Sequence, residues 1–139
     1  MASVIVLDAS VLIAHFRSGD AHAERAFDIL DCEDDLVVHP LTLAEVLVGA
    51  VAQGVEERLL ESLDRIGVET APADAPSPRD LARLRHRQRL KMPDCCVLGL
   101  ALAHGATLAT FDAKLAAVAT TLGLETLGVT PPRAKTYSH

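Results

Sequence analysis

The short apolar segment Val4–Leu7 constrains the fold of this chain more than any other stretch. It holds four apolar residues, three of them β-branched, which is typical of a short buried strand. Asp8 follows at once, and Ser10 is expected to cap the helix that comes next. A carboxylate at the carboxyl end of a first parallel strand lies where open α/β sheets bind their ligands.

Strand-like and helix-like segments alternate along the rest of the chain, which predicts right-handed crossovers and a parallel sheet covered on both faces. Further strands are expected at about 36–39, 67–70, 107–110 and 124–127. Helices are expected at about 10–17, 21–32, 41–53, 55–65, 78–91, 94–104 and 112–122. The predicted architecture is a three-layer α/β/α sandwich with a central, mainly parallel sheet.

Length and composition favour one domain, expected over residues 1–129, followed by a C-terminal tail over 130–139. Hydrophobic residues make up 50% of the chain and aromatic residues 3%, so Leu, Val and Ala are expected to fill the core. No apolar run reaches the roughly 18 residues of a membrane span and no signal peptide precedes the first strand, so we expect a cytoplasmic protein without membrane contact. The spacing of Cys32, Cys95 and Cys96 suits neither a zinc site nor a disulfide framework, so all three are expected in the core.

Four acidic residues are predicted to gather at one edge of the sheet. Asp8 and Asp112 come just after predicted strands, and Glu45 lies in the first turns of a helix that follows another strand. Asp94 begins the helix that leads into the strand near Thr107. Because helices run opposite to the strands in this kind of fold, these helix starts lie at the carboxyl edge.

Each acid also has a purely structural interpretation. Thr42 and Glu45 form a capping-box pattern, and Asp94 suits the dipole of a helix start. Asp112 can cap its helix and Asp8 can end a strand in a turn. These roles are common taken singly, but they do not require the acids to share an edge. Like charges on one edge destabilise a fold unless a cation is bound, and oxygen ligands without nearby Cys or His favour Mg²⁺ or Mn²⁺.

The net charge of −6 argues against a nucleic-acid partner, but the charge is unevenly distributed. Between Arg79 and Lys91, six basic residues oppose the single acid Asp80. The four-residue spacing of Arg79, Arg83, Arg87 and Lys91 predicts one row on a helix that leads to Asp94. Such a row suits binding of a phosphodiester substrate beside a metal site, and a solvated charged face is the alternative.

Four motifs carry a family resemblance that spans Val4 to about Leu127. They are Val-Leu-Asp8-Ala-Ser10, Thr42-Leu-Ala-Glu45-Val-Leu-Val-Gly49, Met-Pro-Asp94 and Leu-Ala-Thr110-Phe-Asp112. In this order they resemble the PIN-domain ribonucleases, and most closely the VapC toxins of bacterial toxin–antitoxin pairs. The resemblance implies a PIN-like sandwich in which the four acids bind metal and carry catalysis while Ser10 and Thr110 orient carboxylates.

The resemblance further implies an endoribonuclease toxin that uses one or two Mg²⁺ or Mn²⁺ ions to hydrolyse RNA phosphodiester bonds. A metal-activated water would attack phosphorus in line and the 3′ oxygen would leave. Asp8, Asp94 and Asp112 would be direct or water-bridged ligands, and Glu45 would be a ligand or would position the water. Many relatives carry another acid or an aromatic residue after the last acid, where this chain has Ala113-Lys114-Leu115-Ala116, so an extra ligand for a second metal is in doubt.

The implied partners are a VapB-type antitoxin that blocks the pocket, an RNA substrate (tRNA, rRNA or mRNA), and a second copy of the chain. A homodimer bound to antitoxin would form a heterotetramer or a larger assembly. Two other functions stay open. One is a PIN-like adaptor that binds RNA or protein without cutting. The other is a signalling domain phosphorylated on Asp8, which the absence of a second aspartate at Ser10 disfavours.

Overall fold

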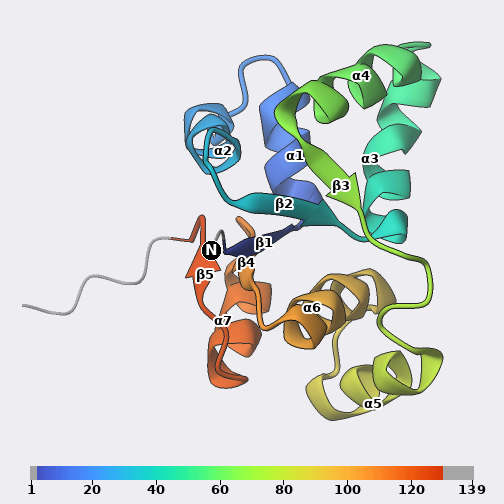
Figure 1. Ribbon diagram of the computed structural model, residues 1–139, viewed down its shortest axis with the longest axis vertical. Helices are drawn as coiled ribbons and strands as arrows, with labels where there is room; N and C mark the ends of the chain where they lie inside the picture. The colour runs from blue at the N-terminus through green and yellow to red at the C-terminus, as the bar shows by residue number, and fades with distance from the viewer. Residues whose placement is uncertain (1–2, 130–139) are drawn as a thin grey trace, which may run out of the picture.

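The computed structural model describes residues 3–129, and the predicted tail over 130–139 lies outside this range. A single sheet runs through the middle of the molecule in the order β3-β2-β1-β4-β5, and every neighbouring pair of strands is parallel (Figure 1). The strands are β1 (Val4–Leu7), β2 (Asp35–Val38), β3 (Val68–Thr70), β4 (Thr107–Ala109) and β5 (Thr126–Leu127). The order of the strands in the sheet therefore places the ends of β2, β1 and β4 side by side at the centre of one edge.

Helices cover both faces of the sheet, as the alternation of segments predicts (Figure 1). One face carries α1 (Ala9–Phe16), α2 (Ala23–Leu30), α3 (Pro40–Ala52) and α4 (Glu56–Ile66). The other face carries α5 (Pro78–Gln88), α6 (Met92–His104) and α7 (Ala113–Thr121). The predicted α/β/α sandwich is confirmed. No helix within residues 3–129 is long and apolar enough to cross a bilayer.

The central strand β1 supplies side chains to both core layers. Ile5 and Leu7 pack under α1 to α4, while Val6 packs on the other face beneath α6. This follows from the alternation of side chains along a strand. Helix α6 is apolar nearly all round, and every residue from Cys95 to Ala101 is buried. Burial of Leu98 and of Leu100 contributes roughly 2 kcal/mol each to the core.

Two predicted helix caps are wrong. Asp8, not Ser10, is the residue before α1, and its side chain makes no capping hydrogen bond. Ser10 lies inside the first turn because α1 begins directly after the strand. Helix α3 begins at Pro40, whose fixed φ suits a first helical turn, and His39 caps it by accepting a hydrogen bond at Nδ1 from the Leu41 N–H over 3.1 Å. Thr42 is fully buried instead of capping, so Glu45 has no capping box to complete.

The cysteine prediction is correct for two of the three residues. Cys95 and Cys96 are buried in α6, and all three cysteines are free thiols. Cys32 is exposed, because α2 ends at Leu30 and the chain turns outward before β2.

Candidate active site

The Asp8 carboxylate is buried and is held by two hydrogen bonds. It lies at the end of β1 and is only 8% exposed. Its Oδ2 atom accepts two hydrogen bonds of 2.7 Å, one from the Ser10 hydroxyl and one from the Thr110 hydroxyl. No hydrogen bond to the Oδ1 atom is found within residues 3–129, so this oxygen is left for a ligand.

The two hydroxyl groups are themselves oriented by the backbone. The Phe111 N–H donates to Ser10 Oγ over 3.0 Å, and the Asp112 N–H donates to Thr110 Oγ1 over 3.0 Å. Each hydroxyl thus accepts from an amide and has its single proton available for Asp8. The network fixes the Asp8 carboxylate to the loop between β4 and α7.

Strand pairing brings this loop to Asp8. The Asp8 N–H donates to the Ala109 carbonyl and the Thr110 N–H donates to the Leu127 carbonyl, both over 2.9 Å. Parallel pairing therefore continues past the formal strand ends and holds Thr110 beside Asp8. Gly128, directly after β5, allows the backbone to approach Thr110 closely. Its φ is +109°, and a Cβ atom there would lie 2.3 Å from the Thr110 carbonyl oxygen.

Asp112 has a divided role. As predicted for the structural interpretation, it caps α7: its Oδ1 atom accepts hydrogen bonds from the Lys114 N–H over 2.9 Å and the Leu115 N–H over 3.1 Å. Its Oδ2 atom has no hydrogen-bond partner among the described residues. Capping fixes the orientation of the carboxylate and does not exclude a second role for the other oxygen.

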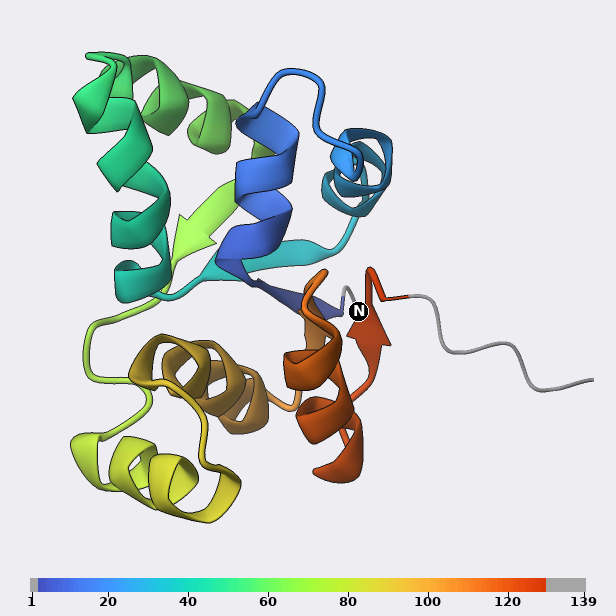
Figure 2. The same ribbon diagram turned by 180° about the vertical axis from the view of Figure 1, so that it is seen from behind.

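Glu45 and Asp94 lie on the first turns of α3 and α6, which approach the carboxyl ends of β1 and β2 (Figure 2). Partial desolvation raises the pKa of Glu45, and the negative charges of Asp8 and Asp94 raise it further. Desolvation also raises the pKa of Asp94, with Asp8 and Asp112 adding to the rise. Because these effects link all four acids, the carboxylates share one electrostatic environment at this edge of the sheet.

The four acids affect one another's pKa values but do not form a closed cage. As the side chains stand, no group of three His, Cys, Asp or Glu residues in 3–129 is arranged to hold a metal ion. Coordination of one ion by three of them therefore requires side-chain movement. The donor set still fits Mg²⁺ or Mn²⁺, because every donor is a carboxylate oxygen and the pKa values of Glu45 and Asp94 are raised by desolvation and then by repulsion between the acids, both of which a bound cation offsets.

The predicted row of four basic residues is interrupted. Helix α5 ends at Gln88, Arg89 takes a left-handed conformation with φ 55°, and Lys91 is the residue that precedes α6. The turn separates α5 from α6 because Pro93 has no N–H to donate to the Arg89 carbonyl, so α5 cannot continue unbroken into α6. A hydrogen bond of 2.6 Å from Arg85 Nη1 to the Leu90 carbonyl stabilises the turn. Arg79, Arg83 and Arg87 remain on α5, whereas Lys91 lies near Asp94.

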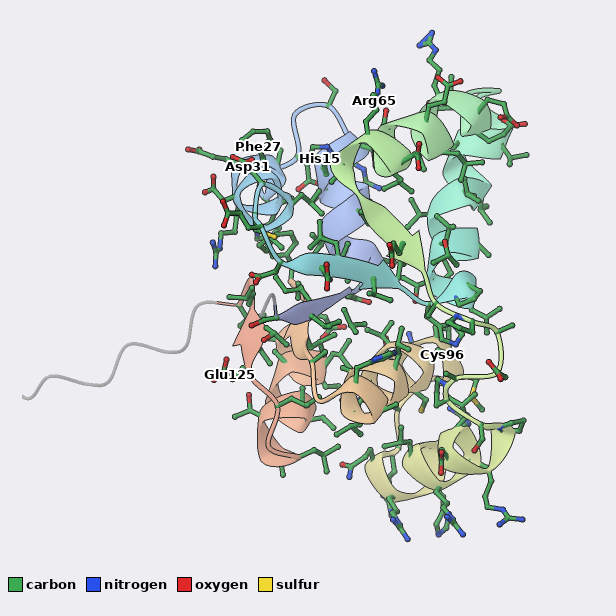
Figure 3. All side chains as sticks on the ribbon, in the orientation of Figure 1. His15, Phe27, Asp31, Arg65, Cys96 and Glu125 are labelled. Atoms are coloured by element: carbon green, nitrogen blue, oxygen red, sulfur yellow. The ribbon has the colours of Figure 1, made fainter. Side chains whose placement is uncertain are left out.

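The basic segment also forms a hollow of about 840 Å³ that sequence reasoning missed. It is lined by Ala82, Arg85, His86, Arg87, Arg89 and Met92. The chain from Arg89 to Met92 links this hollow to the start of α6, which carries Asp94 (Figure 2). A smaller hollow of about 240 Å³ lies between α1, α2 and α4, and its lining includes His15, Phe27, Asp31 and Arg65, which Figure 3 labels.

The PIN domain family model matches residues 5–120, which is most of the chain. The chain belongs to the PIN domain family. The resemblance carried by the four motifs is therefore confirmed at the level of the family. No curated protein sequence matches this PIN domain significantly.

Solved structures share the fold of this PIN domain over nearly its whole length. A toxin–antitoxin complex from Klebsiella pneumoniae is 27% identical, with a TM-score of 0.67 over 92% of this chain and 97% of the other. VapBC2 from Rickettsia felis, bound to a promoter DNA fragment, is 18% identical, with a TM-score of 0.67 over 89% and 98% of the two chains. VapC20 from Mycobacterium tuberculosis, described as a toxin that cleaves the sarcin–ricin loop, is 18% identical, with a TM-score of 0.62 over 91% and 99%.

Proposed function

We propose that this PIN domain is a metal-dependent endoribonuclease and the toxin of a VapBC-type toxin–antitoxin pair. The observation that carries the proposal is the set of four carboxylates at the carboxyl edge, with Asp8 oriented by two hydroxyl groups. A purely structural set of caps does not account for Glu45 and Asp94. Neither carboxylate has a hydrogen-bond partner within residues 3–129, and both have a raised pKa.

The metal ligands would be Asp8, Asp94 and Asp112, with Glu45 as a fourth ligand or as the group that positions the attacking water. A bound Mg²⁺ or Mn²⁺ supplies the Lewis acidity and the activated water that phosphodiester hydrolysis needs. Ser10 and Thr110 hold Asp8 Oδ2, which fixes the carboxylate and leaves Oδ1 without a hydrogen-bond partner among the described residues.

An RNA substrate is supported by a basic segment, Arg79–Lys91, that ends at the start of the helix carrying Asp94. Arg79, Arg83 and Arg87 on α5 are exposed, and Arg89 and Lys91 continue the positive charge toward Asp94. Such a surface binds a phosphate backbone through charge and without base specificity. VapC20 cleaves the sarcin–ricin loop, which is consistent with a structured RNA substrate for this chain.

Protein partners are supported by exposed apolar side chains. On α3, Leu41, Val48 and Val51 are 53%, 70% and 58% exposed, and Phe27 on α2 is 55% exposed. Solvent-exposed apolar groups at helical spacing are typical of surfaces that bind another protein. We propose that a VapB-type antitoxin and a second copy of this chain cover them, since two of the similar structures are toxin–antitoxin complexes.

The experiment that tests the function is an RNA cleavage assay with the partner-free protein. Purified protein is incubated with total RNA and Mg²⁺ or Mn²⁺, beside a reaction with EDTA. Discrete RNA fragments that form only with the divalent cation support the nuclease. Intact RNA under all conditions, with folded protein that binds the cation and the RNA, favours the non-catalytic adaptor. An acid-labile phosphate on Asp8 after incubation with a phosphodonor favours the signalling alternative.

A further inference from the structure

The chain has three lysines, and two of them lie at the four-carboxylate site. Lys91 is the residue before α6 and stands three positions ahead of Asp94. Lys114 lies in the first turn of α7, two positions after Asp112. The two lysines therefore approach the site from different helices that start at the same edge of the sheet (Figure 2).

Neither ammonium group is neutralised by an ion pair. The only salt bridge within residues 3–129 joins Arg17 and Asp20, at the far end of α1. Lys91 and Lys114 are both exposed, and neither side chain has a hydrogen-bond partner among the described residues. Both lysines stand next to acids of the site along the backbone: Lys91 is the N-cap of α6, three residues before Asp94, and the Lys114 N–H donates to Asp112 Oδ1 over 2.9 Å. In agreement with this placement, both ammonium groups lower the pKa of Asp94, against the larger rise that desolvation and the neighbouring acids cause.

We propose that Lys91 and Lys114 bind the RNA phosphates on either side of the scissile phosphodiester. This inference rests on the proposed nuclease function. A bound RNA strand places a negative charge on each side of the bond that is cut, and a surface with four carboxylates repels both. Two unpaired lysines, one beside Asp94 and one beside Asp112, offset this repulsion at the two places where the strand enters and leaves the site.

Lysine suits this task at both positions. Its ammonium group is a compact charge on a flexible stem, so it can follow a phosphate without fixing the base. The arginines of α5 are farther along the chain from the acids and would bind more distant phosphates. Lys91 and Lys114 are thus assigned to the phosphates next to the reacting one, and α5 to the continuation of the strand.

The test uses RNA binding so that it does not depend on cleavage. All variants are made in full-length protein that also carries Asp94→Asn, and a fluorescein-labelled 20-nucleotide RNA is titrated in Mg²⁺ at several salt concentrations. We expect Lys91→Ala and Lys114→Ala each to weaken binding roughly 3- to 10-fold and to reduce the salt slope by about 0.7, the value for one phosphate contact on a single strand. Lys91→Arg and Lys114→Arg keep the charge and should restore both values. The matched control is Arg58→Ala, since Arg58 lies on α4 at the other end of the molecule (Figure 1).

A second measurement covers the case in which a lysine variant fails to fold. The Asp94→Asn protein is acetylated with an amine-reactive reagent, with and without the same RNA, and the lysines are quantified by mass spectrometry. RNA should slow acetylation of Lys91 and Lys114 at least about 3-fold. Equal acetylation with and without bound RNA, or a salt slope that changes no more than in Arg58→Ala, overturns the assignment and leaves the nuclease standing. Absence of any RNA binding by the parent protein instead contradicts the proposed function.

Discussion

The Thr110 hydroxyl donates a 2.7 Å hydrogen bond to Asp8 Oδ2, joining residues 102 positions apart in the chain. The same Thr110 oxygen accepts from the Asp112 N–H. One side chain thus orients the first acid of the site directly and the last acid through its backbone.

Replacement of Thr110 by Val should therefore damage both stability and activity. The variant keeps the shape of the buried side chain but leaves the Asp8 oxygen and the Asp112 amide each without one partner, which costs about 1–3 kcal/mol. Urea denaturation measures the loss of stability, and RNA cleavage should fall about 10- to 100-fold, as for other groups that support metal ligands. Thr121→Val is the matched control, because the Thr121 hydroxyl bonds only to the Ala117 carbonyl on the exposed surface. Equal effects of the two variants on cleavage would contradict the role of Thr110.

Glu45→Gln should stabilise the protein in EDTA. The pKa of Glu45 is raised in the fold, so the folded state holds its proton more tightly than the unfolded state, and stability is lost as pH rises through the folded pKa. At pH 7 the ionised Glu45 therefore destabilises the metal-free protein. Because the side chain is largely exposed, the expected gain in the variant is modest, an increase of about 1–3 °C in Tm. The gain should shrink as pH falls through the raised folded pKa and vanish well below the ordinary value of about 4.5, where the wild-type carboxyl group is protonated in both states.

Addition of Mg²⁺ offers a control for this interpretation. The cation should stabilise the wild type more than Glu45→Gln, because it relieves the repulsion that the variant has already lost. A variant that is less stable than the wild type in EDTA at pH 7 would show that Glu45 has a favourable structural partner instead.

His39 should make the protein sensitive to mild acid. Burial lowers the pKa of His39, and its neutral Nδ1 atom accepts the hydrogen bond that caps α3. The unfolded state takes up a proton near pH 6.5 and the folded state only at lower pH, so stability is lost as pH falls below about 6.5. His39→Asn retains a capping acceptor and should remove this part of the pH dependence, whereas His39→Ala should cost about 1 kcal/mol at neutral pH. Thermal unfolding between pH 5 and 8 decides the matter, and identical pH profiles for wild type and His39→Asn would refute it.

Arg83→Glu combined with Arg87→Glu should weaken RNA binding and flatten its salt dependence, because both side chains lie exposed on α5. The measurement is the apparent Kd for RNA as a function of salt. An unchanged salt slope would assign α5 to the solvated surface. Arg25→Glu combined with Arg58→Glu, on the opposite face of the sheet, controls for the change in net charge.

The element order and the convergence of the acids could be predicted from the sequence because they follow from local patterns. Local patterns predict the bounds of the strands and helices to within a few residues. Examples are the apolar run Val4–Leu7, the apolar helix around Leu98 and the turn residues between such segments. Parallel topology then places the acids at one edge, whatever the details of packing.

The hydrogen bonds of the site could not be predicted in the same way. The sequence pattern predicts that Ser10 caps a helix, but its hydroxyl donates to Asp8 instead. Strand pairing brings the loop after β4 beside Ser10, and the Phe111 N–H in that loop orients the Ser10 hydroxyl. The prediction that Lys91 continues the row of arginines on one helix was wrong for a related reason. The left-handed turn at Arg89 depends on tertiary packing and on the Arg85 hydrogen bond to Leu90. Neither can be predicted from the helical spacing of the basic residues.

The central claim is that the four carboxylates carry metal-dependent RNA cleavage, and Asp94→Asn tests it most directly. This variant keeps the shape of the side chain, removes its charge, and should be at least as stable as the wild type in EDTA because the pKa of Asp94 is raised. We predict that its rate of RNA cleavage in Mg²⁺ falls more than about 100-fold, beyond the effect typical of groups that only support a ligand. Asp80→Asn, in the first turn of α5, should cleave at the wild-type rate. Cleavage by Asp94→Asn at the rate of Asp80→Asn would contradict the account.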